Sequence, residues 1–251
     1  IMSKEPDLMS SNALAVRKDW PALRDILQKG MNSLDQGELS ALREKWLGTE
    51  NPENSAEKTV VLTVAENTWI SDHPVIRVHN EMDWPPFNFN IDGIPTGFSI
   101  DYMNLLATRT GLQLEFISGP SWDEFLNMAR SGDLDVMLNI HKTTGREEYL
   151  NFTTPYSVAP VAVVTGDPDF RIQSMEDLNE KTVAVAGGFF AEEYIRENHP
   201  QINIITELDT IGSLYAVLEG RADAMVDELP TISYLLKSGN LAGLSIAYVS
   251  R

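Results

Sequence analysis

The stretch that decides the fold is Leu138–Tyr156, LNIHKTTGREEYLNFTTPY. It continues an apolar, strand-like run that starts at Val136, and it turns through Lys-Thr-Thr-Gly before a single arginine, Arg146. A planar guanidinium just beyond the end of a strand is well suited to hold a carboxylate through two parallel hydrogen bonds. An ordinary surface arginine in a loop would show the same pattern. The rest of the chain decides between these two interpretations.

Composition excludes several classes of protein. The chain has 251 residues, enough for one two-lobed domain or two small ones. A net charge of −18 argues against binding to nucleic acid or to an anionic membrane surface. The absence of cysteine excludes disulfides and thiolate nucleophiles. No secretory signal peptide is recognisable, and the first residues are typical of a start inside a longer protein.

From Val75 onward, apolar strand-like runs alternate with segments of helical periodicity. This alternation predicts a mainly parallel sheet, whose ligands bind at the carboxyl ends of the strands. Those ends carry the loops of Trp84, Trp122 and Arg146. The expected strands are Val75–Val78, Leu112–Ile117, Leu134–Leu138, Val161–Thr165, Thr182–Ala186, Ile202–Thr206, Ala224–Val226 and Leu244–Val249, and the expected helices are Tyr102–Thr110, Trp122–Arg130, Ala191–Glu197, Thr210–Glu219 and Glu228–Lys237.

Three motifs carry a resemblance to a known family. They are the stretch around Arg146, the segment LTVAENTWISDHPVIRV at 62–78, and RADAMVDELPTISYLL at 221–236. Together they resemble type II periplasmic solute-binding proteins, the bacterial extracellular solute-binding proteins of family 3, as found in tandem in sensor histidine kinases and diguanylate cyclases. The resemblance implies an α/β fold of the Venus flytrap type, with two lobes joined by hinge strands.

The amino-terminal segment has a resemblance of its own. The run LAVRKDWPALRDILQKGMNSL at 14–34 resembles the last hinge strand and terminal helices of a solute-binding domain. The expected domains are therefore 1–49 as such a segment from a preceding copy, 50–74 as linker and joint helix, 75–160 as lobe 1 and 161–251 as lobe 2. We hypothesise that the segment covers lobe 1, within its own chain or on a neighbour, and so completes a circular permutant. The covering residues would be Leu23, Ile26, Leu27, Leu39, Leu42 and Trp46.

The sequence predicts two short elements after the polar linker. Thr59–Thr63 is predicted as a short strand, and the joint helix after it is predicted to bury Trp69 and Ile70 and to end before Pro74.

The resemblance assigns ligand-binding residues in lobe 1. Arg146 corresponds to the arginine that binds a ligand's α-carboxylate, and Trp84 and Trp122 to aromatic residues that sandwich the ligand. Tryptophan also packs well in a core, so both readings stay open for these two. Further candidates are Glu81, Asn139 and His141, and His141 stands where the family usually has serine or threonine.

Lobe 2 supplies the remaining candidates. Gly187, Gly188 and Phe189 lie between a strand and a helix, where a carboxylate could approach backbone N–H groups. The family often has a hydroxyl residue where this chain has Phe189. Asp227 and Glu228 follow a strand, and the acid at the Glu228 position typically accepts hydrogen bonds from a ligand's amino group. The alternative for the glycines is a simple tight turn. The alternative for the two acids is a pair of carboxylates at the start of a helix, where they interact favourably with the helix dipole.

The sequence offers little that resembles a catalytic motif. We therefore expect that the chain is not an enzyme and that it has no cofactor and no metal site. The four histidines, His73, His79, His141 and His199, lack zinc-site spacing, and no hydrolase elbow occurs. The sequence therefore predicts a periplasmic, membrane-anchored sensor domain that binds an amino acid or related zwitterion between its lobes and adjoins other sensor domains. A transport receptor of an ABC importer and a dehydratase-like enzyme are the alternatives.

Overall fold

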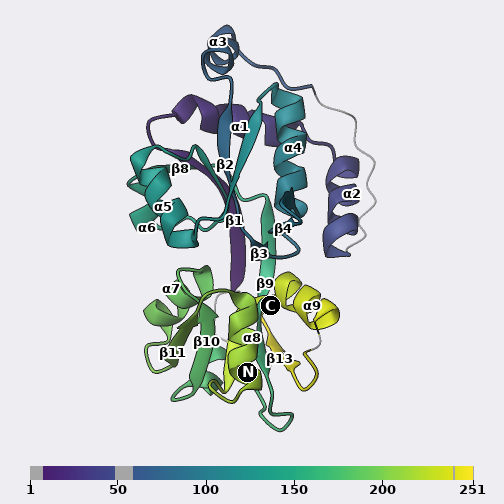
Figure 1. The fold of residues 1–251 in the computed structure, drawn as a ribbon, viewed down its shortest axis with the longest axis vertical. Helices are drawn as coiled ribbons and strands as arrows, with labels where there is room; N and C mark the ends of the chain where they lie inside the picture. The colour runs from purple at the N-terminus through teal and green to yellow at the C-terminus, as the bar shows by residue number, and fades with distance from the viewer. Residues whose placement is uncertain (1–7, 49–58, 240, 251) are drawn as a thin grey trace. The chain divides into compact units, whose positions relative to one another are not determined.

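The computed structural model describes residues 8–48, 59–239 and 241–250 (Figure 1). The chain divides into two compact units. Lobe 1 is Ser11–Ser157, and lobe 2 contains residues 8–10 and the described residues from Val158 onward. The boundary passes through two strands, β1 (Met9–Arg17) and β9 (Ser157–Thr165), so each of these strands contributes residues to both lobes.

Lobe 1 is built on a mixed sheet with the order β1-β7-β2-β6, and with β8 paired to β1. Strands β6 and β7 run parallel to β2, whereas β1 is antiparallel to β7 and β8. Every residue of β7 is buried, as expected for a central strand covered on both faces. The elements are β2 (Ile76–Asn80), β6 (Leu114–Ser118), β7 (Val136–Ile140), β8 (Leu150–Phe152), α4 (Phe98–Thr110), α5 (Trp122–Ser131) and the four-residue α6 (Thr144–Glu147), with a small antiparallel sheet of β3 (Asp83–Trp84), β4 (Asn88–Ile91) and β5 (Ile94–Thr96).

The amino-terminal segment packs on lobe 1. Helix α1 (Pro21–Ser33) contacts α4, and its Leu23, Ile26 and Leu27 are fully buried. Proline at the first turn is well tolerated, because its missing N–H would be unpaired there anyway. Helix α2 (Gln36–Leu47) also contacts α4, but Leu39, Leu42 and Trp46 on it are only half-buried.

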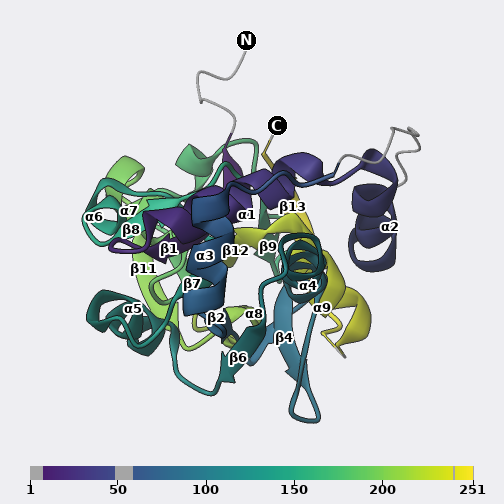
Figure 2. The ribbon, with the colours of Figure 1, turned by 90° about the horizontal axis from the view of Figure 1, so that it is seen from above.

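Helix α3 (Val64–Asp72) lies beside α1 (Figure 2). A capping box starts it: Thr63 accepts from the backbone N–H of Glu66, and the Glu66 carboxylate accepts from the backbone N–H of Thr63. The same carboxylate lies 2.7 Å from Nζ of Lys29 on α1. Residues 59–63 form no strand, so that prediction is wrong; the capping bonds hold Thr63 at the entry to the helix.

Aromatic rings join α3 to the start of α1. Trp69 meets Trp20 edge to face at 5.2 Å and stacks on His73 at 4.0 Å. Trp69 and Ile70 are half-buried, so the prediction that they are buried is wrong. The physical reason is the exposed position of α3, none of whose residues is buried.

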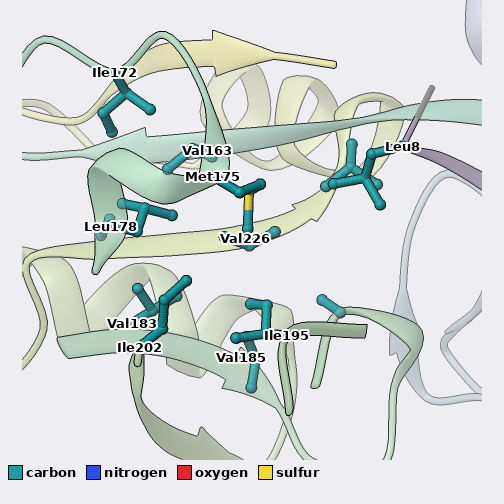
Figure 3. Close-up of a cluster of buried hydrophobic side chains, with 13 residues drawn as sticks. Leu8, Val163, Ile172, Met175, Leu178, Val183, Val185, Ile195, Ile202 and Val226 are labelled. Atoms are coloured by element: carbon teal, nitrogen blue, oxygen red, sulfur yellow. The ribbon is translucent and has the colours of Figure 1, made fainter. Parts of the chain in front are cut away.

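Lobe 2 has a second sheet, with the order β11-β10-β12-β9 and with β13 on the other edge of β9. Strands β10, β11 and β12 are parallel, and β9 is antiparallel to β12 and β13. One face of this sheet packs against α7 and the 3-10 turn η1, and Val183, Val185 and Val226 lie in the core between them (Figure 3). The other face packs against α8 and α9. The elements are η1 (Met175–Leu178), β10 (Thr182–Ala186), α7 (Phe190–Asn198), β11 (Asn203–Glu207), α8 (Thr210–Leu218), β12 (Ala224–Glu228), α9 (Leu229–Ser238) and β13 (Ser245–Val249).

The expected strands and helices of both lobes are present. The strand expected at Ala224–Val226 continues to Glu228, and the one expected at Val161–Thr165 begins at Ser157. Helix α4 begins at Phe98 rather than at the expected Tyr102, and the remaining ends differ by at most two residues, which is the usual uncertainty of such boundaries. Within the described ranges, none of the helices is both long enough and apolar enough to cross a bilayer.

Candidate functional site

Arg146 lies at the carboxyl edge of the lobe 1 sheet, just past β7. Its position is fixed by α6, where the Thr143 side chain accepts a hydrogen bond from the Arg146 N–H at 3.4 Å. Its side chain is only 5% exposed, which excludes a surface arginine. Nη1 donates to the carbonyl of His141 at 3.0 Å, and the guanidinium carbon lies 5.7 Å from the centre of the Trp122 ring. A buried cation that lies over an aromatic ring is a suitable anchor for a carboxylate.

Two of the aromatic candidates differ in their surroundings. Trp122 is half-buried at the start of α5 and lies next to Arg146, as a binding residue would. Trp84 is buried on β3 and stacks on Phe87 at 5.0 Å. Phe87 and Phe89 are also buried. One face of the Trp84 ring therefore packs against the core of lobe 1.

Asn139 is held in an uncommon backbone conformation, with φ at 53°. Its N–H donates to the Tyr156 hydroxyl at 3.2 Å, and its Nδ2 donates to Oγ of Ser99 at 2.7 Å. No described group donates to the buried Oδ1 of Asn139. A left-handed, non-glycine residue with an unused buried acceptor is a feature that clusters at binding sites.

Glu81 and His141 complete the lobe 1 candidates, and the structure adds one residue to them. His141 is half-buried, and its Nδ1 accepts a hydrogen bond from the backbone N–H of Ser11 on β1 at 3.3 Å. Glu81 accepts a hydrogen bond from Nε2 of His79 at 2.9 Å. Sequence reasoning did not include His79 among the candidates; it lies on β2, which ends at Asn80, and Glu81 follows directly after the strand.

Lobe 2 presents the glycine turn before α7. Gly188 adopts a φ of 75°, and its N–H donates to the carboxylate of Glu192 at 2.6 Å. The amides of Gly187 and Phe189 donate to backbone carbonyls. Glu192 also pairs with Arg196 at 2.8 Å. The helix start that was expected to receive a ligand carboxylate thus already contacts a carboxylate of its own chain.

Asp227 and Glu228 end β12 on opposite faces of the sheet. Asp227 accepts from the Thr210 hydroxyl and, at 2.7 Å, from the backbone N–H of Glu228. Burial, together with the neighbouring charge of Glu228, raises the pKa of Asp227 to about 7. Glu228 is also buried, and its carboxylate accepts from the hydroxyl of Ser10 on β1.

The structure therefore brings some candidates together and leaves others apart. In lobe 1, Arg146, Trp122 and His141 form a connected group, to which His79 adds Glu81. Asn139 belongs to a separate network with Ser99 and Tyr156, and Trp84 packs on Phe87. In the described part of the chain, no group of three or more histidine, aspartate or glutamate side chains could hold a metal ion.

Comparison with known sequences now decides the family. The profile of the bacterial extracellular solute-binding proteins, family 3, matches residues 76–207, more than half of the chain. The chain belongs to this family. Its two α/β lobes match the periplasmic binding protein-like Venus flytrap, with a TM-score of 0.67 and 30% identity to the periplasmic VFT2 domain of BvgS from Bordetella pertussis. That match covers 75% of this chain and 81% of the BvgS domain.

Two curated relatives indicate the role of such domains. The virulence sensor protein BvgS of Bordetella pertussis is 28% identical over 94% of this chain, and the match covers 19% of BvgS. The L-cystine-binding protein TcyJ of Escherichia coli K12 is 27% identical over 72% of this chain and 70% of TcyJ. The chain thus spans about a fifth of the length of the sensor it matches. These relatives and the family support a solute-binding, ligand-sensing role.

Proposed function

We propose that this chain is an extracytoplasmic sensor domain that binds a small zwitterion of the amino-acid type. The observation that carries the proposal is Arg146, which is buried at the carboxyl edge of parallel strands and lies over Trp122. In this role Arg146 binds the carboxylate of the solute, and Trp122 provides an apolar wall beside it. Glu228 accepts hydrogen bonds from the amino group.

The two neighbouring acids are not equivalent in this proposal. Both carboxylate oxygens of Asp227 already accept hydrogen bonds inside lobe 2, from Thr210 and from the backbone. Glu228 lies on the other face of β12. It stands where the acid of the resembling motif at 221–236 typically accepts hydrogen bonds from a ligand's amino group, so we assign the amino group of the solute to Glu228 and a supporting position to Asp227.

A thermal-shift screen of the common amino acids and small carboxylates tests this function. A solute at a hundredfold excess over its dissociation constant adds about 2.7 kcal/mol to the free energy of unfolding, which is readily detected. The expected result is stabilisation by at least one zwitterion, and not by the matching amine or carboxylic acid alone. No response to any member of the set would overturn the assignment of the ligand class.

The proposed output is hinge motion, passed to adjoining domains of a membrane-anchored, periplasmic sensor. Strands β1 and β9 each contribute residues to both lobes, so a hinge would lie within them. Small-angle scattering with and without the solute from the screen checks this. A smaller radius of gyration with solute is expected, and an unchanged radius would point to signalling without closure.

We propose that the chain binds its solute without catalysis and acts in a sensor rather than as the receptor of an importer. The relation to BvgS over nearly the whole chain favours the sensor. Incubation of the purified protein with prephenate or arogenate, the substrates of dehydratase relatives, is expected to give no turnover.

A further inference from the structure

Strand β7 has one residue more than β1 in the stretch where the two strands pair. Ala15 of β1 is opposite Met137, and Ala13 is opposite Ile140, so two steps along β1 correspond to three steps along β7. The extra residue makes a β-bulge, and Asn139 lies in it with a φ of 53°. A shift of one residue exchanges the two faces of a strand. The bulge therefore decides which face of the sheet the following residues take.

A closed ring of three hydrogen bonds holds the bulge. The Asn139 N–H donates to the Tyr156 hydroxyl at 3.2 Å, and Nδ2 of Asn139 donates to Oγ of Ser99 at 2.7 Å. The Tyr156 hydroxyl donates to the same Oγ at 2.9 Å, and all three residues are buried. The left-handed conformation is unfavourable for a residue that has a Cβ atom, although asparagine tolerates it better than most. The three hydrogen bonds offset this cost.

Tyr156 is itself anchored at both its backbone and its ring. Its N–H donates to the carbonyl of Asn12 on β1 at 2.9 Å. Its ring stacks on Tyr102 at 4.7 Å and on Phe98 at 6.2 Å, both of which belong to α4. The hydroxyl therefore has a fixed position from which it can hold the bulge.

The loop of the candidate site begins two residues after the bulge. The carbonyl of His141 accepts a hydrogen bond from Nη1 of Arg146 at 3.0 Å, so the place of His141 helps to set the place of the guanidinium. A strand that continued in regular pairing past Met137 would present the following residues on the opposite face. The His141 carbonyl would then no longer lie where Nη1 can reach it.

We propose that Tyr156 is a positioning residue of the candidate site, whose hydroxyl holds the bulge at Asn139 and so sets the place of the Arg146 guanidinium. The inference rests on the proposed function, in which Arg146 binds the carboxylate of the solute. Tyr156 acts through Asn139 and the loop that follows it, without touching the solute. The ring of Tyr156 supports the core of lobe 1, and its hydroxyl supports the site.

A plain core role for the Tyr156 hydroxyl is the competing explanation, and three variants separate the two. Tyr156→Phe removes the hydroxyl and keeps the stacked ring. Tyr102→Phe is the matched control, because it removes a hydroxyl from the neighbouring buried ring and leaves the three hydrogen bonds in place. Asn139→Gly tests the bulge itself, since glycine adopts a positive φ without the steric cost.

The first measurement needs no solute. In NMR spectra of the free protein, a strong nuclear Overhauser effect between the amide and α protons of Asn139 reports its positive φ. The wild type and Tyr102→Phe should both show it. Tyr156→Phe should weaken it and should speed hydrogen exchange of the Asn139 amide about tenfold, because the amide loses its acceptor. Asn139 signals that are the same in Tyr156→Phe and Tyr102→Phe would overturn the proposal.

The second measurement is calorimetry with L-alanine, a probe that offers the carboxylate and the amino group and little else. Tyr156→Phe should weaken its binding about tenfold, and Tyr102→Phe should leave it unchanged. In a protein that already carries Asn139→Gly, the same Tyr156→Phe change should cost clearly less, because glycine needs less support in the bulge. Equal losses in the two backgrounds would leave only a core role for the hydroxyl and would overturn the proposal. A wild type that does not bind L-alanine would count against the proposed function, and the NMR comparison would still decide the role of Tyr156.

Discussion

The hydroxyl of Ser10 on β1 donates a hydrogen bond to the Glu228 carboxylate at the end of β12, although the two residues are 218 positions apart. Both residues are buried in lobe 2. The amino-terminal strand therefore supports the acid that we assign to the amino group of the solute.

Replacing Ser10 by alanine should destabilise the protein without solute. The change removes a donor from a buried carboxylate, and such losses cost about 1–3 kcal/mol. Urea denaturation would measure the change. Ser11→Ala is the matched control, because Ser11 contributes its backbone N–H rather than its side chain to His141. Equal stability of the two variants would mean that the Ser10 hydroxyl contributes nothing to holding Glu228.

Replacing Arg146 by alanine should abolish binding of the zwitterion found in the screen. Two charge-assisted hydrogen bonds would be lost, which corresponds to a reduction in affinity of about a hundredfold or more. Arg146→Lys keeps the charge but not the paired geometry, so it should recover only part of the affinity. Calorimetry measures the affinities, and circular dichroism checks that the fold is kept. Lys142→Ala is the control, since Lys142 is an exposed neighbour paired with Glu147; a similar loss there would show that general charge, not the buried guanidinium, holds the solute.

Asp227 should make stability depend on pH. Its pKa is raised to about 7 by burial, with the Glu228 charge adding to the effect. Because the pKa in the folded state lies above the ordinary value, the protonated form favours folding, and this contribution is lost as pH rises from about 4 through about 7. Asp227→Asn should therefore match the wild type near pH 4 and be more stable at pH 8. The difference should grow by roughly 1 kcal/mol per pH unit across that window.

Chemical denaturation of both proteins between pH 4 and pH 8 checks the slope. The asparagine side chain can still accept from the Glu228 N–H and can donate to the Thr210 hydroxyl, so its packing should be preserved. Asp169→Asn, at an exposed position of the same lobe, is the control and should show no such trend. If the wild type instead gains stability relative to Asp227→Asn between pH 4 and pH 8, the predicted direction of the pH dependence is wrong.

Much of the fold follows from the sequence because its signals are local. The alternation of apolar strands and amphipathic helices predicts both sheets, and the position of Arg146 after β7 follows from the same pattern. The motif around Arg146 then links the local pattern to a family. Sequence could not show that α3 lies outside the core, since Trp69 and Ile70 have the same apolar character whether half-buried or buried.

The details of the candidate site depend on tertiary contacts that the sequence does not reveal. Nothing in the order of residues shows that Glu192 reaches back to the Gly188 amide, or that Asp227 turns toward Thr210. The contact between His79 and Glu81 was not visible either, because the expected strand ended at Val78 and β2 itself ends at Asn80, before Glu81. The burial of His79 and its hydrogen bond from the Leu138 N–H come from the structure alone.

The amino-terminal segment contacts lobe 1 through strand pairing, packing and charge. β1 pairs with β7 and β8, and the side chain of Arg17 donates to the Gly132 carbonyl at 2.6 Å and lies 3.4 Å from Asp135. On α2, Nε1 of Trp46 donates to Asp101 of α4 at 2.7 Å. We propose that residues 11–48 are an integral part of lobe 1 and are needed for its folding.

Deleting residues 1–49 tests this last proposal. The deletion removes β1 from the sheet and exposes the surface of α4 that the fully buried Leu23, Ile26 and Leu27 cover, so the remainder should lose solubility or melt at a lower temperature. A point variant gives a milder test: Leu27→Ala should cost about 2–5 kcal/mol, as buried leucines do, whereas Leu39→Ala on half-buried α2 should cost less. Light scattering then separates two arrangements, because docking within one chain gives a monomer and exchange between chains gives a dimer. A truncated protein that stays soluble and equally heat-stable would show that lobe 1 folds without the segment.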